Sequence, residues 1–181
     1  MRPILLITGA SAGIGAACAK LAAPDYDLAL NYRSDKAGAE AVAREAETKG
    51  ARTLICQAEV DHHFKRLDAL INNAGIVDAV ATVADMDHAR LKRMFDVNVI
   101  GAMMVAQAAA ARMTRQGSGS IVNMGSIAAR LGSANEFVDY AASKAAIDAF
   151  TKGLANEIAA TGVRVNAIRP GLIDTEIHAK A

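Results

Sequence analysis

The sequence is poor in aromatic residues and carries almost no net charge. Aromatic side chains make up 4% of its 181 residues, tryptophan is absent, and 20 basic residues are balanced by 19 acidic ones, for a formal net charge of +1. Proteins that bind nucleic acids present clustered Lys and Arg residues, often interleaved with aromatic ones. The sequence contains no such cluster, so its charge predicts no nucleic-acid partner.

The first residues, MRPILLITGAS, lack the long apolar run of a signal peptide or a membrane span. A short apolar run precedes Thr8 and Gly9, whereas a membrane-spanning helix needs about 20 apolar residues. Signal peptides also contain a longer apolar core than this one. We therefore expect a soluble, cytoplasmic protein with no membrane partner.

Cysteine is scarce as well, and histidine offers no obvious metal site. Cys18 and Cys56 have no CxxC spacing, and with no secretory segment they are expected to be reduced, buried and inert. The neighbouring His62 and His63 lack further Cys, Asp or Glu ligands at suitable spacing. We expect no metal and interpret the His pair as part of a solvated turn.

What the sequence does contain is a regular alternation of short apolar runs and longer amphipathic stretches, within 52% apolar and 22% charged residues. Because most of the apolar runs are apolar on both faces, they are typical of parallel strands covered on each side. The alternation predicts an α/β fold, a Rossmann-type doubly wound parallel sheet with helices on both faces, in a single domain over 1–181. The expected strands are 4–8, 27–32, 52–57, 67–72, 120–125 and 164–169, and the expected helices are 13–22, 35–49, 87–113 and 139–160, with Asp87 as an N-cap.

One connection is too short for this pattern. After ICQAEV comes DHHFKRLDALINNAG, which leaves no room for a helix between two strands that should be parallel. A parallel crossover needs about a dozen or more residues. We expect either an unusual connection or a segment missing near residue 61.

The glycine-rich stretch TGASAGIG, residues 8–15, follows the first expected strand and opens the first expected helix. Gly9 permits a tight turn, Gly13 lets the backbone approach a phosphate, and Gly15 allows the helix to pack closely on the strand. The helix N-terminus would then present free N–H groups to a pyrophosphate. A Walker loop is excluded because no Lys-Ser/Thr follows the last glycine, so the stretch predicts dinucleotide binding.

This glycine spacing, TGxxxGxG, resembles that of the short-chain dehydrogenase/reductase family, and further motifs of that family follow in order. They are NNAG (72–75), VNVIG (97–101), IVNMGS ending at Ser126, YAASK (140–144) and RVNAIRPGLIDT (164–175). Any one of them is weak evidence, but together they cover nearly the whole chain. Among members of the family, NYRSD and RPGLIDTEIH look most like bacterial sugar dehydrogenases and 3-oxoacyl-carrier-protein reductases.

The pair Tyr140 and Lys144 has a physical reason for its spacing. Positions i and i+4 share one face of a helix, so the ammonium lies beside the phenol and favours its phenolate. A free tyrosine has a pKa near 10, and lowering it by about 3 units takes roughly 4 kcal/mol. We expect Lys144 and the positive charge of a nicotinamide to supply that stabilisation.

The resemblance assigns roles to four catalytic residues. It implies Tyr140 as general acid/base, Ser126 as the donor that polarises the substrate oxygen, and Lys144 as the residue that tunes Tyr140 and orients the cofactor ribose. Asn98 would hold a water in a proton relay that reaches Lys144. Hydride transfer itself would be the cofactor's chemistry.

The end of the second expected strand bears on which nicotinamide cofactor binds. NAD-preferring relatives carry an acidic residue there for the ribose 2′-hydroxyl, whereas this chain has Tyr32 followed by Arg33 and Ser34. A guanidinium matches a 2′-phosphate, so NADP(H) is favoured and NAD(H) remains the alternative. The expected cofactor-binding residues are Gly9, Ser11, Ala12, Gly13, Ile14, Gly15, Tyr32, Arg33, Ser34, Glu59, Val60, Asn73, Ala74, Gly75, Tyr140, Lys144, Pro170, Gly171, Ile173 and Thr175.

The substrate is left open by the sequence. Relatives continue beyond a PG motif into a mobile substrate lid, a further helix and a last strand, and we expect these pieces to be missing from the chain. The loop 128–139 mixes small, polar and aromatic residues and selects none of sugars, steroids, small ketones or 3-oxoacyl thioesters. A carbonyl reductase or alcohol dehydrogenase is the leading interpretation. The alternatives are an NAD-dependent alcohol or sugar dehydrogenase, a nucleotide-sugar epimerase, which the glycine spacing and chain length disfavour, and a non-catalytic dinucleotide sensor.

The two longest expected helices, 87–113 and 139–160, suggest self-association. Both are rich in alanine and carry Met103, Met104 and Phe150 as candidates for outward-facing apolar residues. In the family these helices pack across two-fold axes, which implies a homodimer or homotetramer. The alternative is that these three side chains belong to the core.

Overall fold

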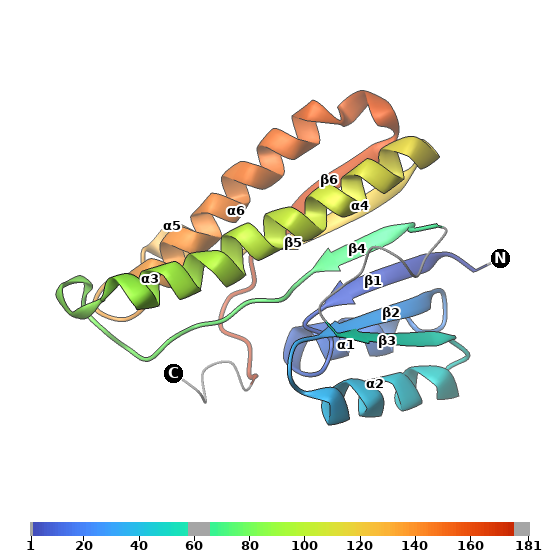
Figure 1. Ribbon diagram of the computed structural model, residues 1–181, viewed down its shortest axis with the longest axis horizontal. Coiled ribbons are helices and arrows are strands. Elements are labelled where there is room, and N and C mark those ends of the chain that lie inside the picture. The colour runs from blue at the N-terminus through green and yellow to red at the C-terminus, as the bar shows by residue number, and fades with distance from the viewer. Residues whose placement is uncertain (1, 58–65, 176–181) are drawn as a thin grey trace.

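The computed structural model describes residues 2–57 and 66–175, which form a six-stranded, entirely parallel sheet in the order β3-β2-β1-β4-β5-β6 (Figure 1). Each strand lies within two residues of its expected position, and the doubly wound fold class is confirmed. The strands are β1 Ile4–Thr8, β2 Asp27–Tyr32, β3 Thr53–Gln57, β4 Ala69–Asn72, β5 Gly119–Met124 and β6 Val163–Ile168.

Helices cover both faces of the sheet and give it two cores. On one face, α1 (Gly13–Ala22) and α2 (Lys36–Thr48) pack over β1 and β2, while α4 (Ala102–Gln116) and α6 (Val138–Glu157) lie on the opposite face (Figure 1). Alternate residues of β1 divide between the cores: Leu5 and Ile7 belong to the first and Leu6 to the second. This division explains why β1 is apolar from Ile4 to Ile7, since side chains of a strand alternate between faces.

The strand order changes direction at β1. The chain runs outward from β1 through β2 to β3, then returns to place β4 on the other side of β1, where Ile7 pairs with Ile71. In doubly wound sheets the crevice at this reversal, outside the carboxyl ends of the strands, is where ligands bind. The residues that follow β1 and β4, the glycine loop and NNAG, therefore meet at that crevice.

The expected long helix is interrupted by a π-helical turn. Asp87 caps α3 (His88–Phe95) by accepting a hydrogen bond from Arg90 N at 2.7 Å, as the sequence predicts. A π-helical segment, η2 (Asp96–Gly101), then joins α3 to α4. The whole stretch His88–Gln116 is long and apolar enough to span a membrane by length and composition alone, but it packs on β4 and β5 and against α6, as a helix of this α/β domain does.

Two short helices, η1 (Val83–Asp85) and α5 (Ala128–Leu131), were not expected from the sequence, because each is too short to show a periodic pattern. A third, η3 (Ala159–Thr161), follows α6 and overlaps the end of the expected helix 139–160. Of these, α5 directly follows β5 and bears on the site described below.

The cramped connection between β3 and β4 joins two strands that are not neighbours, because β2 and β1 lie between them. Residues 58–65 lie outside the described part of the chain, and with them Glu59, Val60, His62 and His63. The expectation of a missing segment near residue 61 therefore stays a prediction.

Candidate active site

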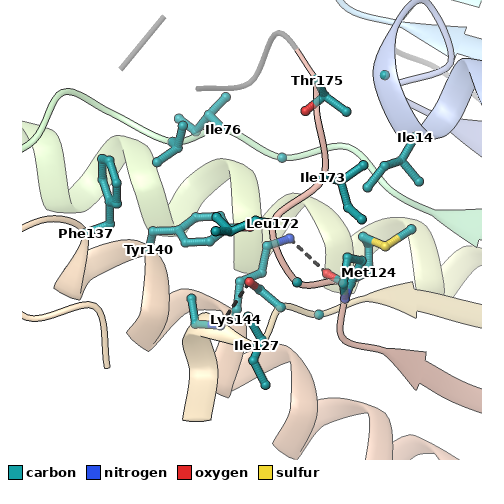
Figure 2. A pocket seen from close by; sticks show the side chains of 18 of the residues that line it. Ile14, Ile76, Met124, Ile127, Phe137, Tyr140, Lys144, Leu172, Ile173 and Thr175 are labelled. Carbon is teal, nitrogen blue, oxygen red and sulfur yellow. Dashed lines mark hydrogen bonds between the residues drawn. The ribbon is translucent and has the colours of Figure 1, made fainter. Parts of the chain in front are cut away.

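A cavity of about 900 Å³ opens at the carboxyl ends of the strands, where the strand order reverses. In Figure 2, Ile14, Ile173 and Thr175 lie at one end of it, whereas Ile76, Phe137 and Tyr140 lie toward the other. Segments from five parts of the chain meet there. The expected site residues that line the cavity are Gly9, Ser11, Ala12, Gly13, Ile14, Asn73, Ala74, Gly75, Ser126, Tyr140, Lys144, Pro170, Gly171, Ile173 and Thr175.

The glycine loop has a backbone that other residues would not tolerate. Gly9 and Gly13 have φ angles of 64° and 54°, in the left-handed region that favours glycine. A Cβ placed on Gly15 would lie 2.2 Å from the carbonyl oxygen of Gly9. Helix α1 can therefore start directly against the turn that ends β1.

The N-terminus of α1 is left open to a ligand. Its N-cap, Ala12, offers no side-chain hydrogen bond, and the first turn contains no acidic residue. The first N–H groups of a helix have no partner within the helix, and their dipoles favour an anion. Together with the close backbone approach at Gly13, this fits the pyrophosphate of a dinucleotide.

A network of buried polar groups ties the NNAG segment to the glycine loop. The hydroxyl oxygen of Thr8 accepts hydrogen bonds from the backbone N–H groups of Asn73 and Ala74, both at 2.9 Å. Asn73 Nδ2 in turn donates to the carbonyl oxygens of Thr8 and Gly9. Asn72 Nδ2 donates to Asn123 Oδ1 at 3.0 Å, which extends the network to β5. The ends of three strands are thereby fixed relative to one another.

Tyr140 and Lys144 lie on one face of α6, and both point into the cavity (Figure 2). The Lys144 ammonium lies 5.6 Å from the centroid of the Tyr140 ring. It also donates a hydrogen bond of 2.9 Å to the carbonyl oxygen of Met124, at the end of β5. The side chain of Lys144 is almost completely buried, and this burial lowers its pKa to about 8.

Ser126 follows β5 by two residues and is held ready to donate. Its Oγ accepts a hydrogen bond from Ala128 N at 3.1 Å, at the start of α5, which leaves the hydroxyl proton free for another partner. Ser126 also forms a side-chain hydrogen bond with Tyr140, which acts to lower the Tyr140 pKa. The two hydroxyls therefore converge on one point of the cavity.

The expected direction of the Tyr140 pKa is wrong for the protein by itself. Burial of the phenol raises its pKa, and this effect outweighs the hydrogen bond from Ser126. The reason is that packing removes water from both members of the pair, so Lys144 also holds its proton less tightly. The lower Tyr140 pKa that the sequence predicts also depends on a second positive charge, that of a bound nicotinamide.

Asn98 lies behind the cavity wall within η2 rather than on its surface. Its side-chain oxygen accepts from Ile76 N and its amide nitrogen donates to Ile76 O, both at 2.8 Å, so it fixes the chain that follows β4. A Cβ placed on Gly75 would lie 3.2 Å from Asn98 Oδ1 and 3.3 Å from Lys144 Nζ. The two polar atoms thus face the same small space beside Gly75.

The residues expected to choose between nicotinamides do not line the cavity. Tyr32 is buried, whereas Arg33 and Ser34 are exposed just after β2. The start of α2 lies against the glycine loop, because a Cβ on Gly38 would be 2.7 Å from Ser11 O. The short turn that carries Arg33 therefore runs beside the loop.

Several cavity residues were not singled out from the sequence. Most are apolar and lie in loops or in the short helix α5, where no periodicity marks them: Ile76, Val77, Ile127, Leu131, Phe137 and Leu172. Glu136 and Lys144 are the charged residues among the described lining. The described residues hold no group of three or more His, Cys, Asp or Glu side chains that could bind a metal.

Comparison with known proteins places the chain among oxidoreductases. A family model described as "short chain dehydrogenase" matches residues 3–181. An uncharacterized oxidoreductase of Escherichia coli, YgfF, is 42% identical over 193 residues, covering 97% of this chain and 78% of the relative. The 3-oxoacyl-[acyl-carrier-protein] reductase FabG of Staphylococcus aureus is 36% identical, over 95% of this chain and 75% of its own length.

A solved structure agrees with these sequence matches. Acetoin dehydrogenase YohF from Salmonella typhimurium superposes with a TM-score of 0.88 at 31% identity, covering 97% of this chain and 74% of its own. The alignment with YgfF is longer than the 181 residues of this chain, so the relative has residues within the matched region that this chain lacks.

Proposed function

The chain belongs to the short-chain dehydrogenase family of oxidoreductases, and on this premise we propose that it transfers hydride between NADP(H) and a carbonyl or secondary alcohol, with Tyr140 as general acid/base. One observation carries the proposal. Tyr140, Lys144 and Ser126 meet in the cavity whose other end is the glycine loop and the open N-terminus of α1.

The glycine loop and α1 would hold the pyrophosphate, and Lys144 would orient the adjoining ribose. When bound, the nicotinamide supplies or accepts the hydride. In reduction, Tyr140 would donate its hydroxyl proton to the substrate oxygen while the carbonyl carbon gains hydride. Ser126 would donate a hydrogen bond to the same oxygen, where negative charge develops. In oxidation the same groups would act in reverse.

Tyr140 must regain its proton after each reduction, and the space beside Gly75 suggests a path. Asn98 Oδ1 and Lys144 Nζ both face it. A water held there would connect the two groups and hand a proton toward Lys144 and Tyr140. The lowered Lys144 pKa, about 8, suits a group that gains and loses a proton near neutral pH.

NADP(H) is the cofactor favoured by the residues after β2. No carboxylate stands at the end of this strand to accept a hydrogen bond from a ribose 2′-hydroxyl, because Tyr32 occupies the position and is buried. Arg33 is exposed and close in sequence to the turn against the glycine loop, where its guanidinium can pair with a 2′-phosphate. NAD(H) is the alternative if Arg33 stays solvated.

The substrate end of the cavity favours a small, uncharged compound. Its described lining is mostly apolar, and Glu136 would repel an anion. Acetoin, which appears in the name of the Salmonella protein, is a small neutral hydroxyketone of this class. We also propose a cytoplasmic enzyme that assembles through α4 and α6 into a dimer or tetramer, because α4 exposes Met103 and Met104.

Tyr140→Phe and Ser126→Ala test the proposal, with diacetyl reduction by NADPH as the probe reaction. Loss of a general acid typically reduces a rate by about 100-fold or more, so we expect kcat to fall by that factor for Tyr140→Phe while NADPH binding persists. Arg130→Gln, which changes an exposed residue of α5, is the control. If Tyr140→Phe keeps full activity, another group is the acid. If the wild type binds NADPH but reduces no member of a carbonyl panel, the sensor interpretation is favoured.

A further inference from the structure

An almost completely buried ion pair joins α3 to the first turn of α6. Arg90 in α3 donates from Nε to Asp139 Oδ2 at 2.7 Å and from Nη2 to Oδ1 at 3.3 Å. The two side chains are 11% and 0% exposed. In every other ion pair among the described residues, at least one side chain is 35% exposed or more.

Arg90 also connects the chain after β4 with the start of α6. Its Nη1 donates to the carbonyl oxygen of Ala79 at 2.6 Å, and its backbone N–H is held by the Asp87 cap. The same two segments are also joined by a backbone hydrogen bond, in which Ala81 N donates to Glu136 O at 3.1 Å. One guanidinium thus joins the chain after β4 to the start of α6, two segments that are far apart in the sequence.

Asp139 directly precedes Tyr140, and its carboxylate accepts a hydrogen bond from Tyr140 N at 2.9 Å. This bond matters because α6 begins at Val138 and its N-cap residue provides no side-chain hydrogen bond. The first-turn N–H groups of a helix have no backbone partner within the helix, so each needs another hydrogen-bond partner. For Tyr140, that partner is the carboxylate that Arg90 holds in place.

We propose that Arg90 is a positioning residue for the reaction: by clamping Asp139, it fixes the first turn of α6 and so the location of the Tyr140 hydroxyl between Ser126 and Lys144. The role rests on the proposed function. Burying an ion pair gains little stability over an apolar pair, so its use here fits a need for one defined geometry. Removing one partner leaves a buried charge without compensation, and the turn that contains it can no longer hold its place.

A positioning role for Arg90 affects the catalytic rate but not the affinity for the cofactor. The glycine loop lies between β1 and α1. Among the described residues, none of its members forms a hydrogen bond with Arg90 or Asp139. A displacement of a catalytic group by about 1 Å can reduce a rate by about 100-fold. Loosening the first turn of α6 should therefore lower kcat without weakening NADPH binding.

The experiment compares Arg90→Gln, Asp139→Asn and the double variant in diacetyl reduction by NADPH. We expect each single change to lower kcat by about 10- to 100-fold while the Kd for NADPH changes by no more than about twofold. The double variant replaces two buried charges by two amides that can pair, so its loss should be smaller than the product of the single losses. Arg90→Lys, which keeps the positive charge, should lose less than Arg90→Gln.

The matched control is Arg93→Gln, on the same helix. Arg93 pairs with the partly exposed Asp78 and does not contact α6 in any described ion pair. We expect its kcat to stay within about twofold of the wild type, because exposed pairs contribute little. An equal loss in Arg93→Gln would overturn the positioning role, since any weakening of this surface would then suffice.

A second readout needs neither cofactor nor substrate. The chain has three tyrosines and no tryptophan, so tyrosinate absorbance can follow Tyr140, with Tyr140→Phe assigning its share. Burial raises the Tyr140 pKa, so a loosened first turn in Arg90→Gln should shift it back toward about 10. If Arg90→Gln lowers only the melting temperature and leaves both this titration and kcat unchanged, the pair is merely structural. Because the titration needs no turnover, it separates this result from a failure of the proposed function.

Discussion

Lys144 combines a functional need with a cost in stability. The residue is 4% exposed, and burial alone lowers its pKa to about 8. The unfolded chain binds the same proton with a pKa near 10.4. Below pH 8 the folded protein therefore carries a buried charge that water would solvate better, and its unfolding free energy is reduced accordingly.

Replacing Lys144 with Met should stabilise the protein at neutral pH while abolishing activity. The pKa difference corresponds to about 3 kcal/mol, from which loss of the hydrogen bond to Met124 subtracts about 1 kcal/mol. The gain is largest below pH 8 and disappears as the pH rises through 8 toward about 10.4, where lysine becomes neutral in both states. Urea unfolding at pH 7 and pH 10 measures this. A gain of the same size at both pH values, or one that Lys152→Met on the exposed part of α6 also gives, would contradict the account.

For single residues, the sequence predicts which side chains form the site better than it predicts their pKa values and hydrogen bonds. The spacing of Tyr140 and Lys144 places both on one helix face, and helix geometry alone guarantees that. Burial is different, because it depends on loops from several parts of the chain closing over the pair. For the protein without cofactor, the direction of the Tyr140 pKa was missed for that reason, and so was the bond from Lys144 to Met124, which comes from β5.

The helical stretch 88–116 shows what can be predicted for an element. Asp87 and the apolar pattern locate the start of the helix to within a residue. The π-helical turn Asp96–Gly101 was not predicted, because it is a single local irregularity within a longer helical stretch. Yet this turn carries Asn98 into the buried position from which it holds Ile76.

The exposed apolar residues of this stretch lead to a prediction about assembly. Ile100, Met103 and Met104 are 54%, 38% and 60% exposed and follow one another at helical spacing. If α4 forms the interface, Met104→Glu should convert a dimer or tetramer into a species of 18.8 kDa, because a charge buried at the interface would lack a partner. Light scattering after size-exclusion chromatography measures the mass. Leu21→Glu, at an exposed position of α1, is the control and should leave the assembly intact.

Either of two results would exclude this interface. The wild type could already be a monomer at micromolar concentration, or Met104→Glu could keep the mass of the wild type. In the second case another surface would mediate assembly.

For the whole molecule, alternation of strands and helices was enough to predict a doubly wound parallel sheet. The alternation does not predict the order of the strands in the sheet, because that order depends on how each crossover connection folds back onto the sheet. That order creates the crevice in which the glycine loop, NNAG, Ser126 and Tyr140 meet, although they are spread over more than 130 residues. The chain spans about three quarters of the length of the relatives that it matches, and its cavity is the place where we propose cofactor binding and acid/base chemistry.

Titration of the purified chain with NADPH and with NADH, followed by cofactor fluorescence, tests the central claim most directly. We predict tighter binding of NADPH, and about a tenfold weaker NADPH complex for Arg33→Ala with NADH unchanged, because a charge-assisted bond to the 2′-phosphate is lost. Gly15→Ala should weaken both complexes, since its Cβ would collide with Gly9 O, whereas Gly153→Ala, with open space around its Cβ, should weaken neither. Two results would contradict the assignment of this cavity as a dinucleotide site. Neither dinucleotide could bind to the wild type, or Gly15→Ala could bind both as tightly as the wild type does.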